Sequence, residues 1–159
     1  MHFHQLRFDN NPLPPLLARC VASVQAVADE HTLHRLPPPE GDLCAWSDYH
    51  RMMILLADPA GVWCDTDVEW HKSFDFQPGV MYCDFRNGEP HGSILTFGGN
   101  REAIEGCLRD AVRREIKAGT RAFHTRLIRH LPFVEIPTEY YTHHYYTMRG
   151  PHGLGDAKN

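Results

Sequence analysis

The sequence predicts a single small α/β domain, in which helices flank a layered sheet. Segments with the composition of strands alternate along the chain with segments whose apolar residues recur at helical spacing. The length of 159 residues and the hydrophobic content of 42% are ordinary for one soluble globular domain. We therefore expect one domain over residues 1–150, a flexible tail over residues 151–159, and ligands at the carboxyl ends of the strands.

The first third of the chain predicts strand, helix, strand and helix in that order. Residues 2–8 (HFHQLRF) alternate as in a short strand, and the prolines that follow precede an amphipathic helix over residues 17–28. Residues 31–37 (HTLHRLP) predict a second strand. Ser47 is the expected N-cap of a second helix, which should end at Asp58 because a proline follows it.

The remaining segments predict a pair of strands, a long helix, and a C-terminal segment with both a helix and a strand. Residues 79–85 and 92–99 are strand candidates with turn residues between them, as in a hairpin or a meander. The clearest helix starts after Asn100, its expected cap, and should end at Gly119. Residues 120–137 predict a helix that turns into a strand. The long helix is predicted to bury a face made of Ala103, Ile104, Cys107, Leu108, Ala111 and Val112.

Charge and composition exclude several classes of protein. The formal net charge of -4 leaves no basic surface for nucleic acid, so no nucleic-acid partner is expected. No run approaches the roughly 18 apolar residues of a transmembrane helix, and we expect a cytoplasmic protein without a transmembrane segment. The five cysteines are far apart in the sequence, which is typical of reduced and mainly buried thiols.

Two aspartates in the segment GVWCDTDVEW (residues 61–70) indicate a metal site. The segment is predicted to be one strand, in which Asp65 and Asp67 point to the same face because side chains two residues apart do so. Two neighbouring carboxylates repel each other, and this repulsion is relieved only if a cation or a strong hydrogen-bond donor lies between them. The alternative is a solvent-facing strand end with two unpaired acids.

Longer stretches around these aspartates resemble a known family. One such stretch is SDYHRMMILLADPAGVWCDTDVEW. It is similar to the segment of the DXD sugar transferases in which an S-D-x-x-R motif is followed by a helix and by a strand that carries the D-x-D motif. This family includes initiating mannosyltransferases and capsular polysaccharide transferases. The N-terminal stretch FHQLRFDNNPLPPLLARCVAS resembles the opening motif of the same family.

The resemblance implies a GT-A-like (Rossmann-like) fold that binds a UDP- or GDP-sugar together with Mn²⁺ or Mg²⁺. By the resemblance, Asp48 and Arg51 contact the donor. Asp65 meets the ribose or the metal through water, and Asp67 binds the metal and the diphosphate. The activity implied is transfer of a sugar with retention of anomeric configuration, for which Asp65, Asp67 and Arg51 are the candidate catalytic residues. The acceptor is left open among a glycan, a lipid-linked sugar and a protein.

Five further residues are candidates for the same site. In the family the first strand runs beside the nucleotide base, so His4 and Gln5 are candidate donor contacts, although His4 is equally a candidate core residue. Trp46 precedes the S-D-x-x-R word and could stack on the base or ribose. A third metal ligand is expected from the histidine pair His143 and His144, and we assign it to His144.

Two other functions are compatible with the sequence. Arg7 and residues 58–61 (DPAG) depart from the family pattern. These departures favour a degenerate member that binds a nucleotide or a partner without catalysis. The twelve histidines also suggest a metal hydrolase, although they form no H-x-x-x-H word. Asp84 and Glu89 are interpreted as ordinary loop acids.

Overall fold

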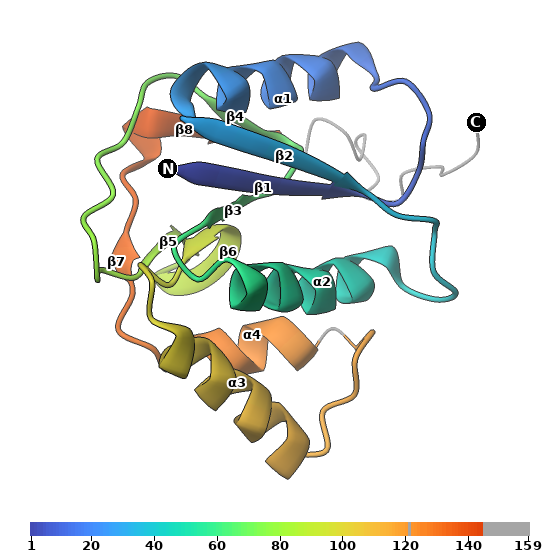
Figure 1. The fold of residues 1–159 in the computed structure, drawn as a ribbon, viewed down its shortest axis with the longest axis vertical. Helices are drawn as coiled ribbons and strands as arrows, with labels where there is room; N and C mark the ends of the chain where they lie inside the picture. The colour runs from blue at the N-terminus through green and yellow to red at the C-terminus, as the bar shows by residue number, and fades with distance from the viewer. Residues whose placement is uncertain (121, 145–159) are drawn as a thin grey trace.

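The computed structural model describes residues 1–120 and 122–144, and the tail expected at residues 151–159 lies outside them (Figure 1). The strands are β1 (His2–Arg7), β2 (Glu30–Arg35), β3 (Val62–Cys64), β4 (Val68–Trp70), β5 (Tyr82–Arg86), β6 (Glu89–Thr96), β7 (Val134–Glu135) and β8 (Tyr141–His143). The helices are α1 (Pro15–Val27), α2 (Leu43–Ala57), α3 (Arg101–Arg113), α4 (Ala122–Ile128) and a 3₁₀ turn, η1 (Thr138–Tyr140). The expected alternation of strands and helices is confirmed.

A six-stranded sheet in the order β2-β1-β3-β6-β5-β7 forms the centre of the molecule. Neighbouring strands pair in parallel except at β6, which is antiparallel to both β3 and β5. The carboxyl ends of β1, β2 and β3 therefore meet at one edge of the sheet. A second, two-stranded sheet pairs β4 with β8 in antiparallel register, with Val68 opposite His143.

Helices cover both faces of the central sheet, which makes a three-layered α/β domain (Figure 1). On one face, α1 and the β4–β8 sheet enclose a core around Phe3, Val24 and Trp70. On the other face, α2 and α4 pack against the sheet around Met52 and Trp63, and α3 packs against these two helices. The predicted fold class, a layered sheet with flanking helices, is confirmed.

The predicted hairpin is β5 and β6, joined by Asn87 and Gly88. Both turn residues have positive φ, 54° and 78° respectively. A two-residue hairpin turn of this kind favours Asn-Gly, because asparagine and glycine tolerate the left-handed region best. The hairpin places the second half of β6 beside β3, with Ile94 opposite Cys64.

The second helix begins earlier than predicted, so the assignment of Ser47 as its cap is wrong. The carboxylate of Asp42 accepts the backbone N–H groups of Cys44 at 2.9 Å and Ala45 at 3.4 Å. A side-chain oxygen that satisfies the free N–H groups of the first turn defines the true N-cap. Asp48 therefore lies in the second turn of α2, which ends before Asp58 as expected.

The third helix is shorter than predicted, although its cap at Asn100 is confirmed by a 3.0 Å bond from the Ala103 N–H to the Asn100 carboxamide oxygen. It ends at Arg113 because Glu115 takes a left-handed conformation with φ of 56°. The Ile116 N–H then bonds the Ala111 carbonyl, and the Glu115 N–H bonds the Val112 carbonyl, in a Schellman motif. The inclusion of Val112 in the buried face is wrong, since 79% of this residue is exposed.

None of the helices in the described part of the chain is long and apolar enough to span a membrane.

Candidate functional site

Asp65 and Asp67 lie at the carboxyl edge of the sheet, immediately after β3. The prediction of one continuous strand through both residues is wrong. A turn interrupts it, closed by a 3.2 Å bond from the Val68 N–H to the Asp65 carbonyl oxygen. The turn nevertheless brings the two carboxylates together, since one oxygen of each lies within 4.8 Å of the other and of a His143 ring nitrogen.

His143 completes this group from the far end of the described chain. The pairing of β8 with β4 carries it to the aspartates, where its Nε2 lies 3.6 Å from Asp67 Oδ1 and 2.9 Å from the Ser93 hydroxyl. His144, the residue that we assigned from the sequence, donates its backbone N–H to the Asp67 carbonyl oxygen at 2.9 Å, but its side chain points to Glu69. Its Nε2 is 2.8 Å from Glu69 Oε2, because neighbouring residues at the end of a strand point in different directions. We call Asp65, Asp67 and His143 the acidic cluster.

The buried side chain of Arg51 contacts the acidic cluster. Its side chain is 5% exposed, and its guanidinium lies 3.1 Å from Asp65 Oδ1 and 3.4 Å from Asp48 Oδ1. The guanidinium carbon also stacks over the Trp63 ring at 5.1 Å, while the Trp63 indole N–H donates to Asp65 Oδ1 at 2.7 Å. Asp48 and Arg51 lie one turn apart in α2 and form an ion pair, and Arg51 joins this pair to Asp65 of the acidic cluster.

Burial makes this edge electrostatically unusual. Burial first, and then the nearby Asp65 charge, raises the pKa of Asp67 to about 7, although Arg86 and His144 act in the opposite direction. Burial likewise raises the pKa of Asp48 to about 6, and this outweighs the opposing effect of the Arg51 ion pair. An additional cation near these carboxylates would therefore be stabilised by them, because it would allow both to ionise.

Three residues of the β5–β6 hairpin extend the site. Asp84 is 3% exposed, and its Oδ1 accepts the Ile94 N–H at 2.9 Å while its Oδ2 lies 3.3 Å from His91 Nδ1. Burial alone raises the Asp84 pKa, but these bonds and the charge of Arg51 hold it below its usual value. The His91 Nδ1 also lies 2.8 Å from the Ser93 hydroxyl, which in turn contacts the acidic cluster.

The interpretation of Asp84 as a loop acid is therefore wrong, because it lies buried within a strand. Its sequence signal was an acid at an inward position of an apolar strand, which is uncommon unless the charge is paired. Glu89 also belongs to a strand, as the first residue of β6, but it is exposed at the turn end of the hairpin.

Of the other predicted donor contacts, Gln5 alone reaches the acidic cluster. Its amide nitrogen donates to the Asp65 carbonyl oxygen at 3.2 Å. His4 lies on the opposite face of β1 and bonds Asp58 at the other edge of the sheet. Trp46 donates its indole N–H to the Glu40 carbonyl at 2.9 Å and packs beside Tyr49 and His50.

Comparisons with known proteins bear on the fold. No family model matches the sequence. No curated protein matches it either. Among solved structures, the chain is similar to a glycosyltransferase involved in the glycosylation of the major capsid of PBCV-1. The two have 12% sequence identity and a TM-score of 0.51, over 79% of this chain and 72% of the other. The chain shares the fold of that glycosyltransferase.

The acidic cluster has the chemistry of a divalent cation site. Two carboxylates and one imidazole converge on one point, and hard cations such as Mg²⁺ and Mn²⁺ prefer oxygen ligands. Arg51 next to it can bind an anionic group, because a guanidinium forms strong hydrogen bonds with phosphate or carboxylate. A cation held by the acidic cluster, beside the buried Arg51 and at the carboxyl ends of the parallel strands β1 and β3, would suit a phosphorylated ligand.

Proposed function

We propose that the protein is a metal-dependent glycosyltransferase that moves a sugar from a UDP- or GDP-sugar, with retention of anomeric configuration. The observation that carries the proposal is the acidic cluster at the carboxyl edge of a sheet whose fold is shared with a solved glycosyltransferase. The fold likeness by itself supports glycosyl transfer only in general. The UDP- or GDP-sugar donor and the retention of configuration are inferred from the resemblance of the sequence to the DXD sugar transferases, and the metal from the chemistry of the side chains.

The side chains of the acidic cluster fit Mn²⁺ or Mg²⁺. Asp65, Asp67 and His143 each offer one ligand atom, and these atoms all lie within 4.8 Å of one another. Burial, and after it the charge of Asp65, raises the pKa of Asp67, so an ionised Asp67 is unfavourable unless a cation lies beside it. A divalent cation bound there would neutralise part of the charge that develops on the departing diphosphate.

The protein residues around this position would orient the donor. Arg51 is buried between Asp48 and Asp65, so its guanidinium is held in one orientation by two carboxylates. Asp48 in turn offers a carboxylate that can accept hydrogen bonds from the hydroxyls of a ribose or a hexose. Fixing the donor in this way lowers the barrier by holding the reacting groups in place, without a protein nucleophile.

The test is donor binding followed by thermal unfolding. UDP, GDP and their sugar conjugates are added to the protein with and without Mn²⁺, because a ligand at a hundred times its dissociation constant stabilises by roughly 2.7 kcal/mol. We expect a rise in Tm that requires both a nucleotide and Mn²⁺ and is lost in Asp67→Asn. Asp75→Asn, at an exposed position, is the matched control and should keep the rise. The absence of a joint nucleotide and metal effect in the unaltered protein would contradict the proposal.

A second candidate is a member of this fold that binds a nucleotide without catalysis. The hydrogen bonds of Asp65 favour this candidate. Its Oδ1 already accepts from Arg51 and Trp63, which leaves this oxygen less available to a metal ion. Slow hydrolysis of the donor separates the two candidates, because a competent transferase site usually transfers some sugar to water. A protein that binds a UDP- or GDP-sugar with Mn²⁺ and releases no free sugar over a long incubation would be the non-catalytic binder.

A further inference from the structure

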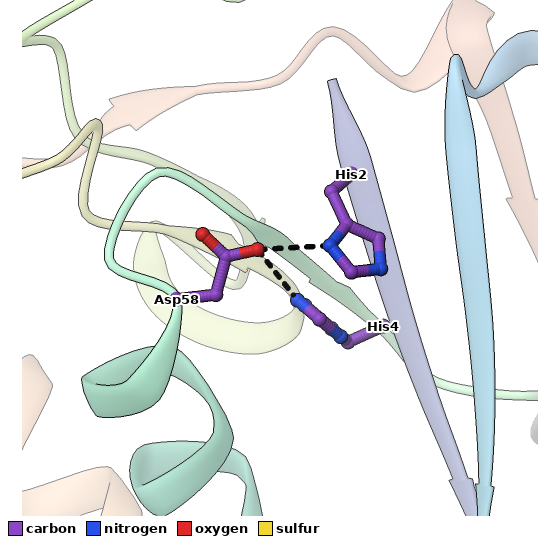
Figure 2. Close-up of side chains that lie close together, drawn as sticks. All are labelled: His2, His4 and Asp58. Atoms are coloured by element: carbon purple, nitrogen blue, oxygen red, sulfur yellow. Dashed lines mark hydrogen bonds and ion pairs between the residues drawn. The ribbon is translucent and has the colours of Figure 1, made fainter.

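A second group of metal-ligating side chains lies at the opposite edge of the sheet, at the amino end of β1 (Figure 2). His2 Nδ1 and His4 Nε2 each lie 3.0 Å from the same oxygen, Asp58 Oδ2. The two histidines are two residues apart on a strand and therefore point to the same face. Asp58 is the C-cap of α2, so the group joins the beginning of the first strand to the end of the second helix.

The spacing of the ligand atoms suits a small ion. The two imidazole rings are 4.0 Å apart between centroids, and all three ligand atoms lie within 4.8 Å of one another. Around a tetrahedral zinc ion, with bonds of about 2.0–2.1 Å, ligand atoms are about 3.3 Å apart. The present 3.0 Å contacts to Asp58 therefore need to open by only a few tenths of an ångström.

Each histidine also has a partner for its other ring nitrogen. His4 Nδ1 lies 3.1 Å from His34 Nε2, and His2 Nε2 lies 2.9 Å from the Thr32 hydroxyl. Histidines that bind metals almost always donate the distal N–H to an acceptor, which fixes the tautomer and the ring orientation. Because β2 supplies an acceptor for both rings, His2 Nδ1 and His4 Nε2 can present lone pairs to an ion.

The backbone of Gly61 lies directly against His4 and Asp58. A Cβ atom on Gly61 would lie 2.8 Å from Cδ2 and Nε2 of the His4 ring and 3.0 Å from Asp58 Oδ2. The backbone of residue 61 therefore approaches the ligands more closely than a side chain would allow. The opposite side is open, since the side chains of His2 and Asp58 are 25% and 34% exposed, so an ion and a fourth ligand from solvent can reach the group.

We propose that His2 Nδ1, His4 Nε2 and Asp58 Oδ2 bind a transition metal ion of the zinc type. Two imidazoles and one carboxylate select Zn²⁺ over Mg²⁺, because imidazole suits the borderline-soft ions. The site is distinct from the acidic cluster, which is richer in oxygen ligands and lies at the other edge of the sheet. A bound ion would link β1 to the end of α2 and thereby stabilise the folded chain.

The test uses Co²⁺ as a spectroscopic probe for Zn²⁺, with the full chain free of any purification tag and with Asp67→Asn introduced to weaken the acidic cluster. We expect one equivalent of Co²⁺ to give ligand-field absorption, which Zn²⁺ should abolish by displacement. His2→Ala and Asp58→Asn should each weaken Co²⁺ binding at least tenfold. Thr32→Val removes only the outer hydrogen bond and should weaken binding about 10- to 100-fold.

His130→Ala, at an exposed position away from the group, is the matched control and should bind Co²⁺ like its parent. Circular dichroism verifies that each variant is folded before the titration. Unchanged Co²⁺ binding in folded Asp58→Asn and Thr32→Val, or no binding by the parent at millimolar Co²⁺, would overturn the proposal.

Discussion

Replacing Asp67 by asparagine should stabilise the metal-free protein, and more so at higher pH. The pKa of Asp67 is about 7 in the folded protein, compared with an ordinary value of 3.8. The folded state therefore holds a proton that the unfolded chain releases above about pH 4. Stability is lost as the pH rises from about 4 to about 7, and the full cost is present above that range.

The magnitude follows from the size of this shift. About three pKa units at roughly 1.4 kcal/mol per unit give a cost of about 4 kcal/mol above pH 7. Asparagine has nearly the same shape and carries no charge, so it avoids this cost. At pH 8 we expect Asp67→Asn to have a higher midpoint urea concentration than the parent and a free energy of unfolding that is larger by up to about 4 kcal/mol. At pH 4 the two proteins should differ little.

Urea unfolding monitored by tryptophan fluorescence, in the presence of EDTA, measures this difference. Adding Mn²⁺ should reverse the order at pH 8, because the parent gains stability by binding the ion and Asp67→Asn loses a ligand. Asp75→Asn, which removes an exposed charge, is the control for the change in net charge. Equal stability of Asp67→Asn and the parent at both pH values would show that Asp67 is not a buried, destabilised carboxylate.

Two further substitutions test the two edges of the sheet. Arg51→Met should destabilise by up to about 3 kcal/mol in urea unfolding, because it leaves the half-buried carboxylates of Asp48 and Asp65 without their guanidinium, and adding Asp65→Asn should restore part of the loss. No recovery in that double variant would argue against the charge pairing. Gly61→Ala should cost about 1–3 kcal/mol, because the new methyl would lie 2.8 Å from the His4 ring, and should weaken Co²⁺ binding at the amino edge. A Gly61→Ala protein with unchanged unfolding and Co²⁺ binding would contradict this account of the close contact.

The local patterns of the chain predicted most of its secondary structure. Alternation over β1 and β2, apolar residues at helical spacing in α1 and α3, and Asn100 as a cap are properties of short segments, and all are present. The error at the start of α2 arose where two local signals competed. Asp42 and Ser47 are both good caps, and only the backbone geometry at Asp42 selects between them.

The acidic cluster was only partly predictable for a related reason. Asp65, Asp67 and Arg51 belong to one continuous stretch, so their proximity could be inferred from sequence order and from resemblance. His143 joins them only because β8 pairs with β4, and the choice between His143 and its neighbour depends on which way a strand residue faces. A two-residue periodicity is not readable at the end of a three-residue strand.

The sequence alone therefore determined the class of fold, the order of its elements and the aspartate pair, because these depend on neighbouring residues and on periodicity. Tertiary structure decided which distant side chains meet. Arg51 is buried next to Asp65 because α2 packs on the sheet. His4 contacts Asp58, 54 residues away, because the amino end of β1 lies beside the end of α2. Such contacts depend on the pairing order of strands and the direction of each side chain, which no short segment of the chain specifies.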